Sequence, residues 1–183
     1  MPVHTWRLAL ALLMAVAAPV AAGMLDLADR ALPYPMPDAT FTRDGQTHSL
    51  TELKDRRYML WLVSTWCHTC IASLRVMEHA RNELSRHGFQ VLLVRNHDND
   101  GAPGPDAHGF ARRFAPALLD TSNWRFGEAS AQMKRQLNPR QYPDIYFLVD
   151  ERGLVQAVST APTVTLDMIL DFARTKSAEG GTP

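Results

Sequence analysis

The segment from Tyr58 to Thr65 (YMLWLVST) is a nearly unbroken run of apolar and aromatic residues, and it constrains the fold most strongly. A run of this length suits a strand that is buried on both faces at the centre of a sheet. From Cys67 to His87 apolar side chains recur at intervals of three and four, which predicts a helix with one buried stripe. Gly88 ends this helix, and Phe89 to Val94 predicts a second buried strand. The sequence therefore predicts a strand-helix-strand unit in an α/β domain.

Weaker patterns on either side of this unit predict the remaining elements. Before it we expect a hairpin over Phe41 to Leu50 that turns at Asp44-Gly45, followed by a helical turn over Thr51 to Asp55. After it we expect helices over Ala107 to Phe114, Glu128 to Leu137 and Thr165 to Arg174, the last with a threonine cap. Further strands are expected over Ala117 to Asp120, Ile145 to Val149 and Leu154 to Ser159, and the last two form a hairpin.

The first 22 residues have a pattern of their own. His4 and Arg7 precede an apolar run from Leu8 to Val20, and the small residues Ala21 to Gly23 follow it, as in a signal peptide. The run is shorter than the roughly 20 residues of a membrane span, so we expect cleavage after Ala22, with an uncleaved anchor as the alternative. The sequence thus predicts a periplasmic or otherwise exported protein.

Length and composition suit one soluble domain, because the chain has 183 residues and is 46% hydrophobic. We expect an extended proline-containing linker over residues 23–37, the domain over 38–175 and a disordered tail over 176–183. Basic and acidic side chains number 19 each, so the charge offers no attraction for a phosphate backbone. We therefore expect a monomer that has no nucleic-acid partner.

Cys67 and Cys70 are the only cysteines of the chain. Closing so short a loop stabilises a fold very little, so chemistry explains the pair better than stability does. In the first turn of a helix, residues three apart share a face and can form a disulfide reversibly. The free N–H groups and partial positive charge of the helix N-terminus stabilise a thiolate, as a protonated His68 would. We therefore predict a redox-active disulfide in which a solvent-open Cys67 attacks and Cys70 resolves.

The order of elements around these cysteines resembles that of a known family. A hydrophobic strand, then Ser64-Thr65-Trp66-Cys67-His68-Thr69-Cys70, then a long helix is similar to thioredoxin-like thiol-disulfide oxidoreductases of the TlpA group, over nearly all of the mature chain. The resemblance implies a three-layer α/β fold, with a central mixed β-sheet flanked by helices and an N-terminal hairpin extension. It also implies reduction of disulfides in client proteins, no cofactor, and a membrane thiol electron donor. The Trp-Cys-X-Thr-Cys form further resembles the thioredoxins of cytochrome c maturation.

The segment Tyr142-Pro143-Asp144, which precedes the predicted strand Ile145 to Val149, matches the cis-proline segment of these proteins. The resemblance implies that Pro143 follows a cis peptide bond and lies beside Cys67. It also implies that the backbone of Tyr142 is free to pair with an extended client peptide. The client groove and the tuning of the cysteines are assigned to Trp66, His68, Thr69, Tyr142 and Pro143.

Three positions depart from the proteins that the chain resembles. Thioredoxins carry a buried Asp six residues before the first cysteine, where this chain has Trp61. Several TlpA-like reductases carry a Glu six residues after it, where this chain has Ser73. The residue before the proline is Tyr142, where thioredoxins commonly have Thr. The sequence therefore identifies no acid that handles the proton of the cysteine pair.

Metal binding is the alternative explanation for the cysteines. Structural zinc needs four ligands, and no further cysteine exists to complete such a site. Thiolates bind Cu(I), so a thioredoxin-fold copper chaperone assisted by His97 or His108 is the second hypothesis, although such chaperones usually separate their cysteines by three residues. Asn96 to Gly101 is interpreted as a polar turn, because a calcium loop starting at Asp98 would place Gly109 where a Glu is needed. We therefore expect no metal site.

Overall fold

The computed structural model describes residues 30–175, which form one mixed sheet with helices on both faces. The strands are β1 (Tyr34–Pro35), β2 (Thr40–Arg43), β3 (Gln46–Ser49), β4 (Tyr58–Val63), β5 (Gln90–Arg95), β6 (Trp124–Ala129), β7 (Asp144–Val149) and β8 (Leu154–Ser159). The helices are α1 (His68–Arg86), α2 (Ala107–Phe114), α3 (Ala131–Leu137) and α4 (Pro162–Arg174). Short 3₁₀ segments are η2 (Leu50–Leu53), η3 (His97–Gly101) and η4 (Pro116–Leu118).

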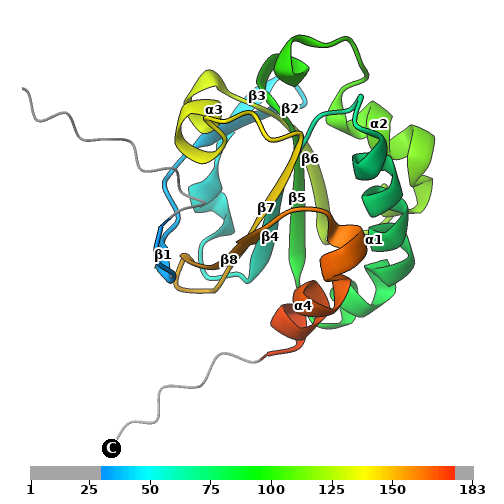
Figure 1. The fold of residues 1–183 in the computed structure, drawn as a ribbon. Helices are drawn as coiled ribbons and strands as arrows, with labels where there is room; N and C mark the ends of the chain where they lie inside the picture. Colours follow the sequence, from blue (N-terminus) through cyan, green and yellow to red (C-terminus); the bar gives the residue numbers. More distant parts are fainter. Residues whose placement is uncertain (1–29, 176–183) are drawn as a thin grey trace, which may run out of the picture.

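The sheet separates two hydrophobic layers. Figure 1 shows α1, α2 and α4 on one face and α3 on the other. Leu74 of α1, Phe110 of α2 and Ile169 of α4 belong to the first buried cluster. Met133 and Leu137 of α3 belong to the second. The expected three-layer arrangement with a central mixed sheet is therefore confirmed.

Strand β4 lies in the middle of the sheet, whose order is β1-β8-β7-β4-β5-β6-β2-β3. All six of its residues are buried. It runs parallel to β5, with Leu60 opposite Leu92, and antiparallel to β7, with Leu60 opposite Phe147. Because both edges of β4 are paired and both faces are covered, its apolar run is explained, and the predicted unit β4-α1-β5 is confirmed.

The predicted N-terminal hairpin is also present and extends the sheet. Strands β2 and β3 pair with Thr42 opposite Thr47, and the turn residues Asp44 and Gly45 have φ of 52° and 75°. Two successive positive φ values match the twist of a tight hairpin, which is why an Asp-Gly pair stands there. Strand β2 then pairs with β6 at Thr42 opposite Glu128, so the hairpin closes that side of the sheet.

Two expectations about the segment after α2 are wrong. Ala117 to Asp120 was predicted as a strand, but Pro116 begins the 3₁₀ segment η4, in which Leu119 N–H donates to the Pro116 carbonyl at 3.1 Å. The sequence predicts that Glu128 begins a helix, but Glu128 lies in strand β6, which ends at Ala129. Helix α3 is instead capped by Ser130, whose side chain accepts from Met133 N–H at 3.0 Å. Strand β6 was missed because its sequence, WRFGEA, does not alternate cleanly, and it is defined by pairing with β5 far away in the chain.

The last helix begins earlier than its predicted threonine cap. Helix α4 has Pro162 in its first turn and Ala161 as its N-cap residue, and no side chain caps it. Thr165 lies inside the helix with φ of −119°, and its hydroxyl accepts a hydrogen bond of 2.7 Å from Tyr146. Pro162 begins the helix because its fixed φ suits a first turn and its missing N–H costs nothing there.

The sequence predicts a signal peptide, an extended linker and a disordered tail at the two ends of the chain. The expected signal peptide (1–22) and tail (176–183) lie outside the described residues. Within the expected linker 23–37, β1 pairs with β8 at the edge of the sheet, with Tyr34 opposite Val155. Over residues 30–175, no helix combines the length and the apolar character needed to span a bilayer.

Gly127 is expected to be necessary for the junction of the hairpin with the sheet. A Cβ at this position would lie 2.7 Å from Cδ2 of Phe41 and 3.1 Å from the Thr42 carbonyl oxygen. We expect Gly127→Ala to lower the free energy of unfolding by about 1–3 kcal/mol, as overpacking does, measured by urea denaturation. In a Phe41→Leu background the ring edge is removed, so the same substitution should cost less. An equal cost in both backgrounds would contradict this explanation.

Candidate active site

The Cys67-Cys70 pair lies at the junction between β4 and α1. Cys67 is the N-cap residue of α1, and Cys70 lies in its first turn. The exposed fraction is 6% for Cys67 and 0% for Cys70, while Trp66 beside them is 45% exposed. The expected helix-terminal position is present, but Cys67 is less open to solvent than expected, because the residue packs into the core layer. Cys67 is still the cysteine of the two that retains exposed surface.

Two donors face the Cys67 sulfur, which is not joined to Cys70 by a disulfide in this structure. The Cys70 N–H lies 3.3 Å from Cys67 Sγ, and the Thr69 hydroxyl lies 3.0 Å from it. Both groups can donate to a sulfur that carries negative charge, and they add to the partial positive charge of the helix N-terminus. This arrangement favours a nucleophilic sulfur at Cys67.

Cys70 has the opposite environment. Its thiol donates to the Pro143 carbonyl oxygen at 3.2 Å. Burial, the hydrogen bond with Cys67 and the negative charge of Asp144 together raise the pKa of Cys70 well above that of an ordinary thiol. Cys70 is therefore held as a thiol until something removes its proton.

The loop before β7 reaches the cysteines without the expected cis bond. The Tyr142–Pro143 bond is not cis, and the cis peptide bond found among the described residues is Leu32–Pro33. The bend is made instead at Gln141, whose φ is 56°. The Pro143 carbonyl accepts from Ser64 N–H at 2.8 Å as well as from Cys70, so this loop does lie against the cysteine motif.

The backbone of Tyr142 is not free for a client, which corrects the second expectation for this loop. Its N–H donates to Asn138 Oδ1 at 2.8 Å. Its carbonyl accepts from Asn138 Nδ2 at 2.8 Å and from Asn96 Nδ2 at 3.1 Å. The two amides also bond to each other, Asn138 Nδ2 to Asn96 Oδ1, at 2.9 Å. Two asparagines thus fix the position of the loop.

The polar turn η3, which follows β5, forms hydrogen bonds with the residues just before Cys67. Asn99 accepts from Thr65 N–H through Oδ1 at 2.8 Å and from Trp66 Nε1 through its carbonyl at 3.0 Å. The Ser64 hydroxyl donates to Asp100. Asn99 and Asp100 both have positive φ, which Asn and Asp tolerate better than most residues. The sequence indicated a polar turn here, but its contacts with the motif depend on the fold.

Asp144 is the site residue that sequence reasoning missed. It is 6% exposed and directly follows Pro143. Its Oδ1 accepts from Trp61 Nε1 at 2.7 Å, and its Oδ2 accepts from Ala161 N–H at 3.2 Å. Burial raises the pKa of Asp144, and these two hydrogen bonds oppose the rise. The sequence does contain one indication of this buried acid, because Asp144 stands at the start of an otherwise apolar strand.

The histidines proposed as copper ligands make contacts of their own. His97 Nδ1 lies 3.2 Å from the Ala129 carbonyl, and its Nε2 lies 3.1 Å from Asp98. His108 packs edge-on against Phe126 and lies 3.0 Å from Arg112. Over residues 30–175, no group of three or more His, Cys, Asp and Glu side chains is placed to hold a metal.

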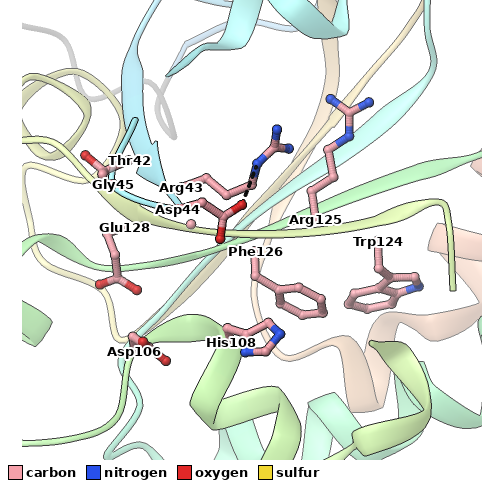
Figure 2. Close-up of a pocket in the computed structure, with 11 residues that line it drawn as sticks. Thr42, Arg43, Asp44, Gly45, Asp106, His108, Trp124, Arg125, Phe126 and Glu128 are labelled. Carbon is pink, nitrogen blue, oxygen red and sulfur yellow. Dashed lines mark ion pairs between the residues drawn. The ribbon is translucent and has the colours of Figure 1, made fainter. Parts of the chain in front are cut away.

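A pocket of about 500 Å³ lies along β6, and neither cysteine lines it. Figure 2 shows Trp124 and Phe126 near His108 on one side of the β6 ribbon, with Arg125 on the other. The rings of Trp124 and Phe126 stack with centroids 6.3 Å apart. His108 of the copper hypothesis lines this pocket, but none of the residues assigned to the cysteine site or the client groove does. The candidate active site is therefore the region around the cysteines.

The chain is similar to known proteins in its family and in its fold. The family model described as Redoxin matches residues 34–173. No curated protein matches the sequence. Many solved structures share its fold, and those described next are each 20% identical or less to this chain.

The similar structures fall into two named groups. A putative thiol:disulfide interchange protein DsbE from Chlorobium tepidum has a TM-score of 0.55 and 20% identity, covering 77% of this chain and 96% of its own. Apo Sco1 from Thermus thermophilus has a TM-score of 0.55 and 18% identity, covering 82% and 97%. ScoI from Arabidopsis thaliana, solved with copper bound, has a TM-score of 0.54 and 12% identity, covering 77% and 99%. These likenesses establish the fold.

The two cysteines are expected to differ sharply in alkylation. We expect limiting iodoacetamide at mildly alkaline pH to modify Cys67 in the reduced protein and to leave Cys70 unmodified, because Cys70 is buried and its pKa is raised. Peptide mass spectrometry of the labelled protein measures this. Denatured protein, in which both thiols are accessible, is the control. Equal labelling of both cysteines in the native protein would contradict the described environments.

Proposed function

Because the chain belongs to the Redoxin family, we propose that it is an exported thiol-disulfide oxidoreductase that reduces disulfides in client proteins. The placement of the cysteines carries this proposal. Cys67 sits at the N-cap of α1 with two donors facing its sulfur, and Cys70 lies buried behind it as a thiol. One nucleophilic sulfur and one protected sulfur are what sequential thiol-disulfide exchange needs.

The family assignment agrees with the resemblance found in the sequence. The fold is the expected thioredoxin-like α/β fold, with a mixed sheet between two helical layers. The Cys-X-X-Cys pair lies where the central strand β4 meets α1. At this level the resemblance to thioredoxin-fold proteins is confirmed.

The exchange proceeds through a mixed disulfide. The Cys67 thiolate attacks one sulfur of a client disulfide, and the other client sulfur leaves with the electron pair and takes up a proton. Cys70 then loses its proton and attacks Cys67 Sγ, so that a Cys67–Cys70 bond forms while the bond from Cys67 to the client sulfur breaks. That client sulfur leaves with the electron pair and takes up a proton. The client gains two electrons, and the cysteine pair becomes oxidised.

The surface around Cys67 supplies the contact with the client. Trp66, His68 and Thr69 are exposed beside it. The indole N–H of Trp66 is bonded to Asn99, so the ring has a fixed orientation and offers an apolar face at little entropic cost. We assign the other wall of the groove to Pro143 and the side chain of Tyr142. The Tyr142 hydroxyl accepts from Arg140 at 3.1 Å.

The direction of electron flow and the cellular setting belong to this proposal. A membrane thiol donor would re-reduce the oxidised pair after each cycle. The Trp-Cys-His-Thr-Cys motif, similar to that of cytochrome c maturation thioredoxins, suggests apocytochrome cysteines as one class of client. Export rests on the signal-peptide pattern of residues 1–22, with cleavage after Ala22.

A copper chaperone that uses the same cysteines is the competing hypothesis. His97 and His108 bond to groups other than the cysteines, so they offer no ready third ligand. Titration of the reduced protein with Cu(I) tests this function directly. Tight stoichiometric uptake that is lost when a histidine is removed would favour the chaperone over the reductase.

We expect Cys70→Ser to accumulate a mixed disulfide with a client, because the resolving thiol is gone while Cys67 can still attack. Disulfide-bonded insulin and an oxidised peptide carrying Cys-X-X-Cys-His serve as probes, and non-reducing gels with mass spectrometry detect the adduct. Cys67→Ser should form no adduct and lose turnover. Absence of adducts from the Cys70→Ser protein with both probes would contradict the mechanism.

The reduction potential of the Cys67–Cys70 couple distinguishes reductant from oxidant. We expect a value near that of thioredoxin, about −270 mV, when the protein is equilibrated with glutathione or dithiothreitol buffers. A value near that of the oxidant DsbA, about −120 mV, would show that the protein oxidises its clients instead.

A further inference from the structure

Asp144 is a buried acid without a partner cation, and the cysteine chemistry proposed above does not explain it. It is 6% exposed, and none of the ion pairs within residues 30–175 includes it. A buried carboxylate that has no cation is costly to keep and is often found at a functional site.

Both carboxylate oxygens of Asp144 are held by neighbouring elements. Trp61 of β4 donates to Oδ1 at 2.7 Å, and the backbone of Ala161, just before α4, donates to Oδ2 at 3.2 Å. Two titratable groups interact electrostatically with this carboxylate, Cys70 from α1 and Tyr146 from β7. The Tyr146 hydroxyl already donates to Thr165 at 2.7 Å. Cys70 is therefore the neighbour that has a proton to give during the exchange.

We propose that Asp144 accepts the proton of Cys70 when Cys70 resolves the mixed disulfide, and that Trp61 is the positioning residue that holds its carboxylate. The inference rests on the proposed function and adds a residue to it. In the reduced protein the Cys70 thiol donates to the carbonyl of Pro143, the residue next to Asp144. The carboxylate of the next residue interacts electrostatically with Cys70, so it is placed to receive this proton.

The step balances without another reactant. Asp144 takes the Cys70 proton and becomes a neutral acid, and the Cys70 thiolate attacks Cys67 Sγ. The Cys67–Cys70 bond forms as the bond from Cys67 to the client sulfur breaks, and the electron pair leaves on the client sulfur. That sulfur takes up a proton, either directly from Asp144 or from solvent. In the second case Asp144 then releases its own proton to the solvent.

The electrostatic setting suits a proton acceptor. Burial raises the pKa of Asp144, which brings its proton affinity closer to that of a thiol and makes it a better base than an exposed Asp. Its negative charge also helps to raise the pKa of Cys70. Removing the charge of Asp144 would favour the Cys70 thiolate and speed resolution of the mixed disulfide. Removing a base would slow the formation of this thiolate and slow resolution. The two roles therefore predict opposite changes in the resolution rate.

The experiment follows thionitrobenzoate release when the reduced protein reacts with the aromatic disulfide 5,5′-dithiobis(2-nitrobenzoate). The first release reports the attack of Cys67, and the second reports resolution by Cys70. We expect Asp144→Asn to leave the first phase unchanged and to slow the second about a hundredfold near neutral pH, as loss of a general base does. Trp61→Phe should move the acid limb of the second phase to higher pH, because the lost hydrogen bond had lowered the pKa of Asp144.

Asp150 provides the matched control. It is 7% exposed and follows the other end of β7. Burial raises its pKa, but bonds from Leu154 N–H, Arg152 and Gln156 outweigh this effect and lower the pKa overall. Asp150→Asn should therefore leave both phases unchanged, although it removes an equally buried acid.

Each other outcome overturns the inference. A faster second phase in Asp144→Asn would mean that the residue acts only through its charge. An unchanged second phase, even with reduced stability, would mean that it only ties β7 to β4 and α4. If Asp144→Asn does not fold, an unshifted pH profile in Trp61→Phe is the result that overturns the proposal. Failure of the wild-type protein to give a first phase would instead contradict the proposed function itself.

Discussion

The carbonyl oxygen of Pro143 joins the two halves of the site. It accepts from Ser64 N–H at 2.8 Å and from the Cys70 thiol at 3.2 Å, so the end of β4, the start of α1 and the loop before β7 meet at one atom. The loop cannot move without breaking one of these bonds. The side chains of Asn138 and Asn96 also fix this loop, because they form hydrogen bonds with the backbone of Tyr142. The position of the cysteine pair thus depends on hydrogen bonds to the backbone of the loop before β7.

The two sulfurs share one helical turn but have unequal surroundings. Cys67 faces a backbone N–H and a hydroxyl at the end of α1, whereas Cys70 lies among apolar side chains and near a carboxylate. The two sulfurs are therefore not equivalent, because hydrogen-bond donors face the sulfur of Cys67, whereas burial and the nearby carboxylate raise the pKa of Cys70 and keep it a thiol. The position of Asp144 follows from the same geometry, since β7 begins beside Cys70 and β4 carries the indole that holds the carboxylate.

Local chemistry was enough to predict most of the elements. The buried run of β4, the periodic stripe of α1, the Asp-Gly hairpin and the strands β7 and β8 are encoded within a few residues of one another. Strand β6 was misread because its polar residues are explained only by partners elsewhere, as when Arg95 pairs with Glu128. The threonine cap of α4 is misplaced because Pro162 begins the helix earlier. Thr165 lies inside the helix, where its hydroxyl accepts from Tyr146 of β7 and donates to the Ala161 carbonyl.

By itself the sequence determined that a Cys-X-X-Cys pair caps a helix after a central buried strand, because strand burial, helical period and capping are properties of neighbouring residues. Only the tertiary structure decided which groups surround the two sulfurs. The bend at Gln141, the asparagines behind Tyr142 and the acid at Asp144 are brought to the cysteines by the order of strands in the sheet. Contacts between distant segments depend on that order, and no local pattern records it.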